Sequence, residues 1–205
     1  DPSANEHIIE TLSEEGGIFL AKYTPNGQLT WSRTILPIRD MYIYDMQVDG
    51  LGGIYISGTY SDSVKLDFES DEVIYSSGYN NRFLAKYTSN GALVWYKLLN
   101  TGSNFWFQIN QENEVIASCK YSYTIDIGSF GSPQVINGGV SNILLAKFAS
   151  SGDIIWYKSS VAPPNFTLGG IGSDGNGNCY ITGVFTGSFD ADFDTGTHVL
   201  TTNPW

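Results

Sequence analysis

An internal repeat constrains the fold of this 205-residue chain more than any other feature. The segment Phe19-Leu20-Ala21-Lys22-Tyr23 returns at residues 83–87 and again, as Leu-Leu-Ala-Lys-Phe, at residues 144–148. The lysines of the three copies are 64 and then 61 residues apart. Self-similarity at a nearly fixed period indicates one structural unit that is stacked on copies of itself.

A short turn and a second apolar segment follow each copy. The turns are Asn-Gly, Asn-Gly and Ser-Gly, which favour β-hairpins because glycine supplies the positive φ that tight turns need. Each second segment contains a tryptophan at the same place, and we assign the three to packing because they recur: Trp31, Trp95 and Trp156.

A second hairpin lies elsewhere in the period. Residues 46–58 contain an Asp-Gly-Leu-Gly-Gly turn between two alternating apolar runs, and residues 171–183 repeat this pattern. The middle copy, residues 107–119, has lost the glycines but keeps the alternation. No segment shows helical spacing of apolar residues. Each period therefore predicts four strands. We call them a, b, c and d, and in residues 44–99, taken as the example, they are a (44–49), b (53–60), c (82–88) and d (92–99).

Four strands per repeat and no helices are typical of the blades of a β-propeller. The fold prediction is an all-β propeller segment of about three four-stranded blades. A hairpin-like excursion links b to c at residues 61–81, 122–142 and 186–205. The single segment 1–205 divides into strands c and d at 17–36, blades at 41–99 and 103–160, and strands a and b at 168–205.

Three blade equivalents are fewer than the ~4 to 8 that close a propeller ring. Two explanations stay open. The chain is part of a longer one that supplies further blades, which we favour because both ends fall inside an excursion. Alternatively, copies associate to complete a ring, for example two sets of three.

The chain resembles the SBBP-type β-propeller repeats of secreted bacterial proteins, many of them from Bacteroidetes-type bacteria. The resemblance depends on the residues from Asp174 to Gly183, on Asp192-Phe193-Asp194, and on the Leu-Ala-Lys-Tyr, Asn-Gly and Trp series above. It covers nearly the whole chain, although the turn at 110–113 departs from the pattern. The resemblance implies an exported or cell-surface protein, whose signal peptide we expect upstream, and says little about function.

The charge, the apolar runs and the cysteines limit the partners, the membrane association and the disulfides that we expect. The net charge of −11 and the pI near 4.3 oppose binding to nucleic acid or to anionic lipid surfaces. No apolar run approaches the ~20 residues that span a bilayer, so we expect no membrane insertion. Cys119 and Cys179 occupy different repeat positions, which favours two free thiols over a disulfide.

Aromatic residues gather around the predicted d-to-a connections: Tyr42, Tyr44, Phe105, Trp106 and Phe166. With their Asn and Ser neighbours, they are typical of a surface that binds carbohydrate or peptide through ring stacking and hydrogen bonds. The competing interpretation is packing between blades, because strand a begins near these positions.

An acidic segment lies in the last excursion. Asp190, Asp192 and Asp194 place carboxylates at i, i+2 and i+4, and oxygen-rich loops of this kind can hold Ca²⁺. The same spacing fits the solvated face of a strand. We favour the solvated face, because the position of Asp190 is taken by Lys65 in another copy.

Nothing in the sequence singles out a catalytic apparatus. Nucleophile-elbow, metalloprotease and phosphate-loop motifs are missing, and His7 and His198 occupy one repeat position rather than forming a pair. We predict a non-catalytic binding or scaffolding module with a protein or glycan ligand and no cofactor, apart from the calcium considered above. Two alternatives stay open, a lectin-like propeller and a propeller glycosidase or lyase with acids on the acidic excursions or outside the chain.

Overall fold

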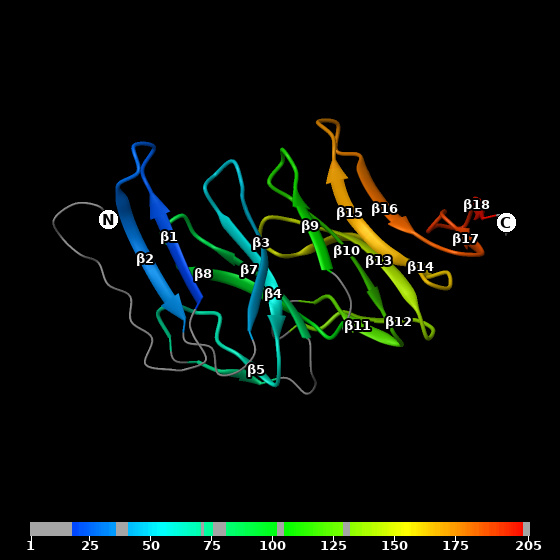
Figure 1. The fold of residues 1–205 in the computed structure, drawn as a ribbon, viewed down its shortest axis with the longest axis horizontal. Helices are drawn as coiled ribbons and strands as arrows, with labels where there is room; N and C mark the ends of the chain where they lie inside the picture. Colours follow the sequence, from blue (N-terminus) through cyan, green and yellow to red (C-terminus); the bar gives the residue numbers. More distant parts are fainter. Residues whose placement is uncertain are drawn as a thin grey trace.

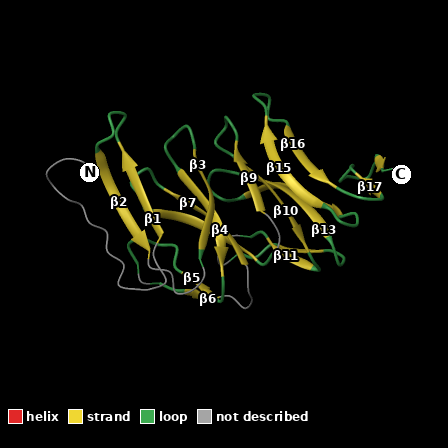
Figure 2. Ribbon diagram, viewed as in Figure 1, coloured by secondary structure: helices red, strands yellow, loops and turns green. Residues whose placement is uncertain are grey.

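A computed structural model of the chain describes residues 18–35, 41–70, 72–75, 81–101, 105–128 and 132–202. These residues form strands and turns, and they contain no helix (Figure 2). The sheets are all antiparallel. The all-β prediction is therefore confirmed.

Two sheets have four strands and five have two strands, and four of these seven sheets, two of each size, form the stack. Their strands, in chain order, are β1 (Ile18–Tyr23) and β2 (Leu29–Ile35); β3 (Tyr42–Val48), β4 (Ile54–Tyr60), β7 (Asn81–Tyr87) and β8 (Leu93–Leu99); β9 (Phe105–Ile109), β10 (Val115–Tyr121), β13 (Asn142–Phe148) and β14 (Ile154–Val161); and β15 (Thr167–Ser173) and β16 (Cys179–Val184). Each four-stranded sheet is a meander in the order β3-β4-β7-β8 or β9-β10-β13-β14.

The four sheets follow one another in chain order along the long axis of the molecule (Figure 1). Each neighbouring pair encloses one apolar cluster: Leu20 packs with Phe83, Leu84 packs with Val115, and Ile143 packs with Leu168. β4 is buried at all seven positions because a sheet covers each of its faces. Its sequence, Ile-Tyr-Ile-Ser-Gly-Thr-Tyr, accordingly lacks the charged residues of a strand with one face in water.

Three small hairpins lie within the predicted excursions. They are β5 (Ser63–Val64) with β6 (Ile74–Tyr75), β11 (Thr124–Asp126) with β12 (Val135–Asn137), and β17 (Ser188–Asp190) with β18 (Val199–Thr201). β5 and β11 lie on the opposite side of the stack from the short turns (Figure 1). Leu66, Ile125 and Phe189 of these excursions are parts of the apolar clusters, so the excursions close the ends of the cores between sheets.

The cationic side chain of each fourth strand reaches the excursion of the next repeat. Arg33 Nη2 lies 3.9 Å from Glu69 Oε1, and Lys158 Nζ lies 2.7 Å from Asp194 Oδ2. Lys97, at the same repeat position, donates instead to the backbone oxygen of Ile127 at 2.9 Å. One contact between repeats is thus made three times with different chemistry.

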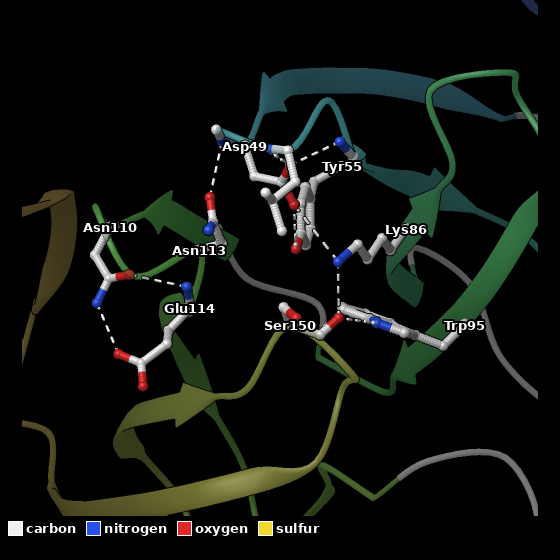
Figure 3. A network of polar contacts seen from close by, with 11 residues as sticks. Asp49, Tyr55, Lys86, Trp95, Asn110, Asn113, Glu114 and Ser150 are labelled. Atoms are coloured by element: carbon white, nitrogen blue, oxygen red, sulfur yellow. Dashed lines mark hydrogen bonds and ion pairs between the residues drawn. The ribbon is translucent and has the colours of Figure 1, made fainter.

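At the short-turn side, polar side chains link the two four-stranded sheets (Figure 3). Lys86 Nζ lies 3.5 Å from Asp49 Oδ2 and donates at 2.8 Å to the backbone oxygen of Ser150 in the next repeat. Trp95 Nε1 donates to the same oxygen at 3.0 Å. Asp49 also accepts the hydroxyl of Tyr55 at 3.1 Å. Lys22 repeats the first link by donating to the backbone oxygen of Ser89 at 3.2 Å.

Both cysteines are free thiols, as the sequence favours. Cys119 is fully buried in the central cluster, and this burial raises the pKa of its thiol to about 12. Among the described residues, no helix has the length and apolar character needed to cross a bilayer.

Candidate functional site

A β-bulge at the start of β3 shapes one wall of a cavity that aromatic side chains line. Ile43 pairs with Gly58 and Asp45 pairs with Ser57, so Tyr44 is an extra residue without a cross-strand partner. A Cβ on Gly58 would lie 2.1 Å from the backbone oxygen of Tyr42, and only glycine permits this approach. Bulges redirect the side chain of the extra residue, here the ring of Tyr44.

Two polar residues of the same sheet hold Tyr44. The hydroxyl of Thr59 donates to the Tyr44 hydroxyl at 3.3 Å, and the guanidinium carbon of Arg82 lies 5.0 Å from the centre of the Tyr44 ring. The hydrogen bond from Thr59 and the adjacent Arg82 lower the pKa of the Tyr44 hydroxyl. The ring is nevertheless largely exposed, so it can present a face to a ligand.

The neighbouring sheet supplies the opposite wall through Phe105 and Trp106 of β9. The ring of Phe105 stacks on that of Phe107 with 6.4 Å between centres, which fixes it against the core. Gln47 holds the two sheets together beside this wall: its Nε2 donates to the backbone oxygen of Phe107 at 2.9 Å, and its Oε1 accepts the amide of Ile109 at 3.0 Å.

The cavity between these strands has a volume of 290 Å³ and is lined by Tyr44, Asp45, Arg82, Phe105 and Trp106. It combines three aromatic rings with one carboxylate and one guanidinium. The carboxylate of Asp45 accepts the amide of Met46 at 2.8 Å and Nε2 of Gln47 at 3.0 Å, so its orientation is fixed. Rings for stacking and fixed polar groups for orientation are the usual components of a small-ligand site.

Three of the five aromatic residues predicted for ligand binding therefore come together, and two do not. Tyr42 is 60% exposed on β3 but does not line the cavity. Phe166 is only 7% exposed and packs against Phe189 with 6.0 Å between ring centres. Phe166 thus takes the packing position that the sequence left open as the alternative.

The acidic segment is engaged in folding its own loop. Asp190 Oδ1 accepts the backbone amides of Asp192 at 3.0 Å and His198 at 2.9 Å, and Asp192 Oδ1 accepts the amide of Asp194 at 2.8 Å. Asp194 is paired with Lys158 at 2.7 Å. Asp190, Asp192 and Asp194 lie among the described residues, which contain no group of three or more His, Cys, Asp or Glu side chains arranged to hold a metal ion. Calcium binding at this segment stays a prediction.

Two of the three recurring tryptophans pack against the next repeat. The Cβ position of Gly91 lies 3.3 Å from the ring of Trp31, and that of Gly152 lies 3.0 Å from the ring of Trp95. The glycines are those of the turns between the third and fourth strands, so Trp31 and Trp95 each cover the turn of the following sheet. Trp156 instead lines a cavity together with Cys179 and Phe193. His7 lies outside the described residues.

Sequence reasoning missed two residues of the cavity, Asp45 and Arg82. Arg82 lies in β7 opposite Thr59 of β4, and only the pairing of these strands brings it to Tyr44. The register of β4 with β7 would have revealed this contact. Tyr55 pairs with Lys86, and counting four residues along both strands brings Thr59 opposite Arg82. Asp45 follows Tyr44 directly in the sequence, so the prediction of Tyr44 as a binding residue could have included it.

The fold and cavity together define an all-β repeat protein with face-to-face sheets and an aromatic site between two of them. A scan against models of protein families finds no match to the chain. A search of curated proteins finds no match either.

Proposed function

We propose that the chain is a segment of a β-propeller of the SBBP type, from an exported or cell-surface bacterial protein, and that it acts as a non-catalytic binding module. The repeat of four-stranded meanders and their face-to-face packing in chain order support the blade interpretation. The resemblance of the repeat motifs supports the exported location.

The cavity of Tyr44, Phe105 and Trp106 is the observation that carries the binding function. Its volume of 290 Å³ is at the lower end of the range for ligand sites, which suits one or two sugar rings. The apolar face of a pyranose stacks on aromatic rings, and its hydroxyls pair with a carboxylate or a guanidinium, here Asp45 and Arg82. We infer that the ligand is a glycan.

The lining favours binding over hydrolysis. Glycoside hydrolysis commonly uses two carboxyl groups that flank the bond to be broken. Asp45 is the single carboxylate among the residues that line the cavity. A lectin-like role therefore accounts for the lining with fewer additional groups than a glycosidase or lyase role does.

A glycan array followed by titration with the sugars that bind tests this proposal. Tyr44→Ala and Trp106→Ala each remove a ring of the cavity, and each should weaken binding about tenfold or more, equal to a loss of about 1.4 kcal/mol. Tyr42→Ala is the matched control, since Tyr42 is an exposed ring of the same strand outside the cavity.

Two results would contradict glycan binding at this cavity. One is an array on which no glycan binds the unaltered protein. The other is binding that survives in both cavity variants, or that Tyr42→Ala reduces as strongly as Tyr44→Ala does.

A further inference from the structure

The two-stranded sheets at the two ends of the stack are complementary halves of one four-stranded sheet. β1 and β2 occupy the positions of β7 and β8 in their repeat, and β15 and β16 occupy those of β3 and β4. In the complete sheets, β4 pairs with β7 and β10 pairs with β13. Among the described residues, β1 pairs with β2 alone and β16 pairs with β15 alone, so each has an open edge.

The outer face of β1 exposes side chains that are buried in the other repeats. Phe19 is 67% exposed and Tyr23 is 55% exposed, whereas Phe83 and Tyr87 at the same positions are each 1% exposed. In the complete sheet these rings lie against the fourth strand of the preceding sheet, where Trp31 packs on the same cluster. The face of β1 thus has the composition of a buried surface but is uncovered.

A cavity of 470 Å³ at the other end of the stack matches these two rings. Leu145 and Trp156 of the preceding sheet form one wall, and Ala191 and Phe193 of the last excursion form another. These residues occupy the same repeat positions as the residues that surround a buried ring in the earlier repeat.

The earlier repeat shows what such a cavity holds. There, the Tyr87 hydroxyl donates to the backbone oxygen of Leu66 at 2.8 Å, and its ring lies 5.2 Å from that of Phe68. Leu66 and Phe68 occupy the repeat positions of Ala191 and Phe193. A tyrosine placed as Tyr23 is would find the same oxygen and the same ring.

Charge complementarity identifies the hairpin more closely. The Tyr180 hydroxyl donates to Asp174 Oδ2 at 3.0 Å, as the Tyr55 hydroxyl does to Asp49 at 3.1 Å. In the complete sheet, the third member of that group is Lys86, which lies opposite Tyr55 in the ladder and 4.9 Å from the centre of its ring.

Lys22 of β1 occupies the position of Lys86. The middle repeat has no such Asp–Tyr pair, because Asn110 and Ile116 stand there and Lys147 pairs with Glu114. The Asp174–Tyr180 pair at the edge of β16 can therefore accept a lysine, and β1 carries one at the matching repeat position.

We propose that the β1–β2 hairpin of one copy of this chain docks on the β16 edge of a second copy and completes a four-stranded antiparallel sheet. The register follows from the β4–β7 ladder, with Lys22 opposite Tyr180 and Tyr23 opposite Cys179. Phe19 and Tyr23 enter the cavity beside Trp156, and Lys22 joins Asp174 and Tyr180. The contact is head-to-tail, so it generates a closed ring or a longer assembly, according to the rotation between copies.

The native thiol of Cys179 allows a direct test of this register. Tyr23→Cys places a second thiol opposite Cys179 of the partner copy, and mild oxidation should link chains into a covalent dimer or larger species on a non-reducing gel. Phe19→Cys is the matched control, because it removes an aromatic ring from the same face of β1 but lies four residues, roughly 13 Å, further along the strand. It should give no such species.

Sedimentation velocity covers the case in which the Tyr23 substitution itself prevents docking. The unaltered chain should sediment at 22.5 kDa when dilute and at twice this mass or more at high micromolar concentration. Ala21→Arg should stay at the lower mass, because Ala85 and Ala146 at the same position are fully buried. Leu51→Arg, at an exposed turn position, should behave like the unaltered chain.

Three results would overturn the proposal. They are an unaltered chain that stays at the lower mass at every concentration, equal cross-linking of the two cysteine variants, and a disulfide formed within one chain. None of these results bears on glycan binding, which uses the cavity of Tyr44.

Discussion

Raising the pH above neutrality should relieve a cost that one buried lysine imposes on the fold. Lys97 is 2% exposed in β8. Its Nζ donates to the backbone oxygen of Ile127 at 2.9 Å and lies 4.5 Å from the centre of the Phe148 ring. Burial removes water from the ammonium group and lowers the pKa of Lys97 to about 8, despite the nearby carboxylates of Asp126 and Asp153.

The sign and size of the effect follow from this shift. In an unfolded chain, a lysine titrates at about 10.4. Between pH about 8 and this value, the unfolded state holds a proton that the native state has released, so the free energy of unfolding rises with pH. From about pH 7 to about pH 9.5, a single group of this kind contributes about 2 kcal/mol. The neutral amine keeps its N–H donors, so the bond to Ile127 survives the titration.

The comparison with Lys97→Met isolates this group. Methionine keeps much of the length of the side chain but does not titrate. Urea unfolding followed by tryptophan fluorescence, repeated across the pH range, should show the difference between the two proteins shifting by about 2 kcal/mol in favour of the unaltered chain.

A difference is needed because the Cys119 thiol opposes the lysine. Its pKa of about 12 lies above the value of about 8.5 for an unfolded thiol, so Cys119 withdraws stability as the pH rises between these values. Both proteins contain Cys119, and its contribution cancels.

Lys158→Met is the matched control, since Lys158 holds the same repeat position with a side chain that is 42% exposed. This variant keeps Lys97 and should therefore keep the rise in stability with pH that Lys97 causes. A difference between the unaltered chain and Lys97→Met that stays constant with pH would refute the reasoning.

Two further pairs of substitutions test the fold. Gly58→Ala places a Cβ 2.1 Å from a β3 carbonyl oxygen and should lower the free energy of unfolding by about 2 kcal/mol. Gly172→Ala, whose Cβ would have no atom within 4 Å, should change it little. Equal effects of the two substitutions in urea unfolding would contradict the bulge geometry. Trp95→Phe removes the hydrogen bond to the Ser150 oxygen, whereas Trp31 Nε1 is buried without a partner among the described residues. Trp95→Phe should therefore lower the free energy of unfolding by about 1 kcal/mol more than Trp31→Phe does. Thermal unfolding that ranks the two substitutions the other way would contradict this assignment.

The strands of this chain were open to prediction because their turns are fixed by local chemistry. The predicted b, c and d strands, 53–60, 82–88 and 92–99, compare with β4, β7 and β8 at 54–60, 81–87 and 93–99. The turn glycine Gly91 has a φ of +85°, a conformation that glycine adopts without strain, and it marks the end of one strand and the start of the next. Alternation then sets the remaining boundaries to within two residues.

The site was only partly open to prediction, because side-chain direction depends on register and not on residue type. Tyr44, Phe105 and Trp106 meet in one cavity, whereas Phe166, chosen by the same criterion, is buried. A shift of one residue along a strand moves a side chain to the other face of its sheet, and the bulge at Tyr44 introduces such a shift. Arg82 became a neighbour of Tyr44 through the pairing of β4 with β7, which spans an excursion of about twenty residues.

The turn of the middle repeat shows how variation between repeats can add recognition between sheets. Asn113 replaces the glycine of the other copies and still adopts a φ of +60°, which asparagine tolerates better than most residues. Its side chain, which glycine lacks, accepts the amide of Gly50 from the preceding sheet at 2.8 Å (Figure 3). Asn110 meanwhile accepts the amide of Glu114 at 2.8 Å and so keeps the turn closed. The departure from the repeat pattern therefore preserves the hairpin and gains an intersheet hydrogen bond.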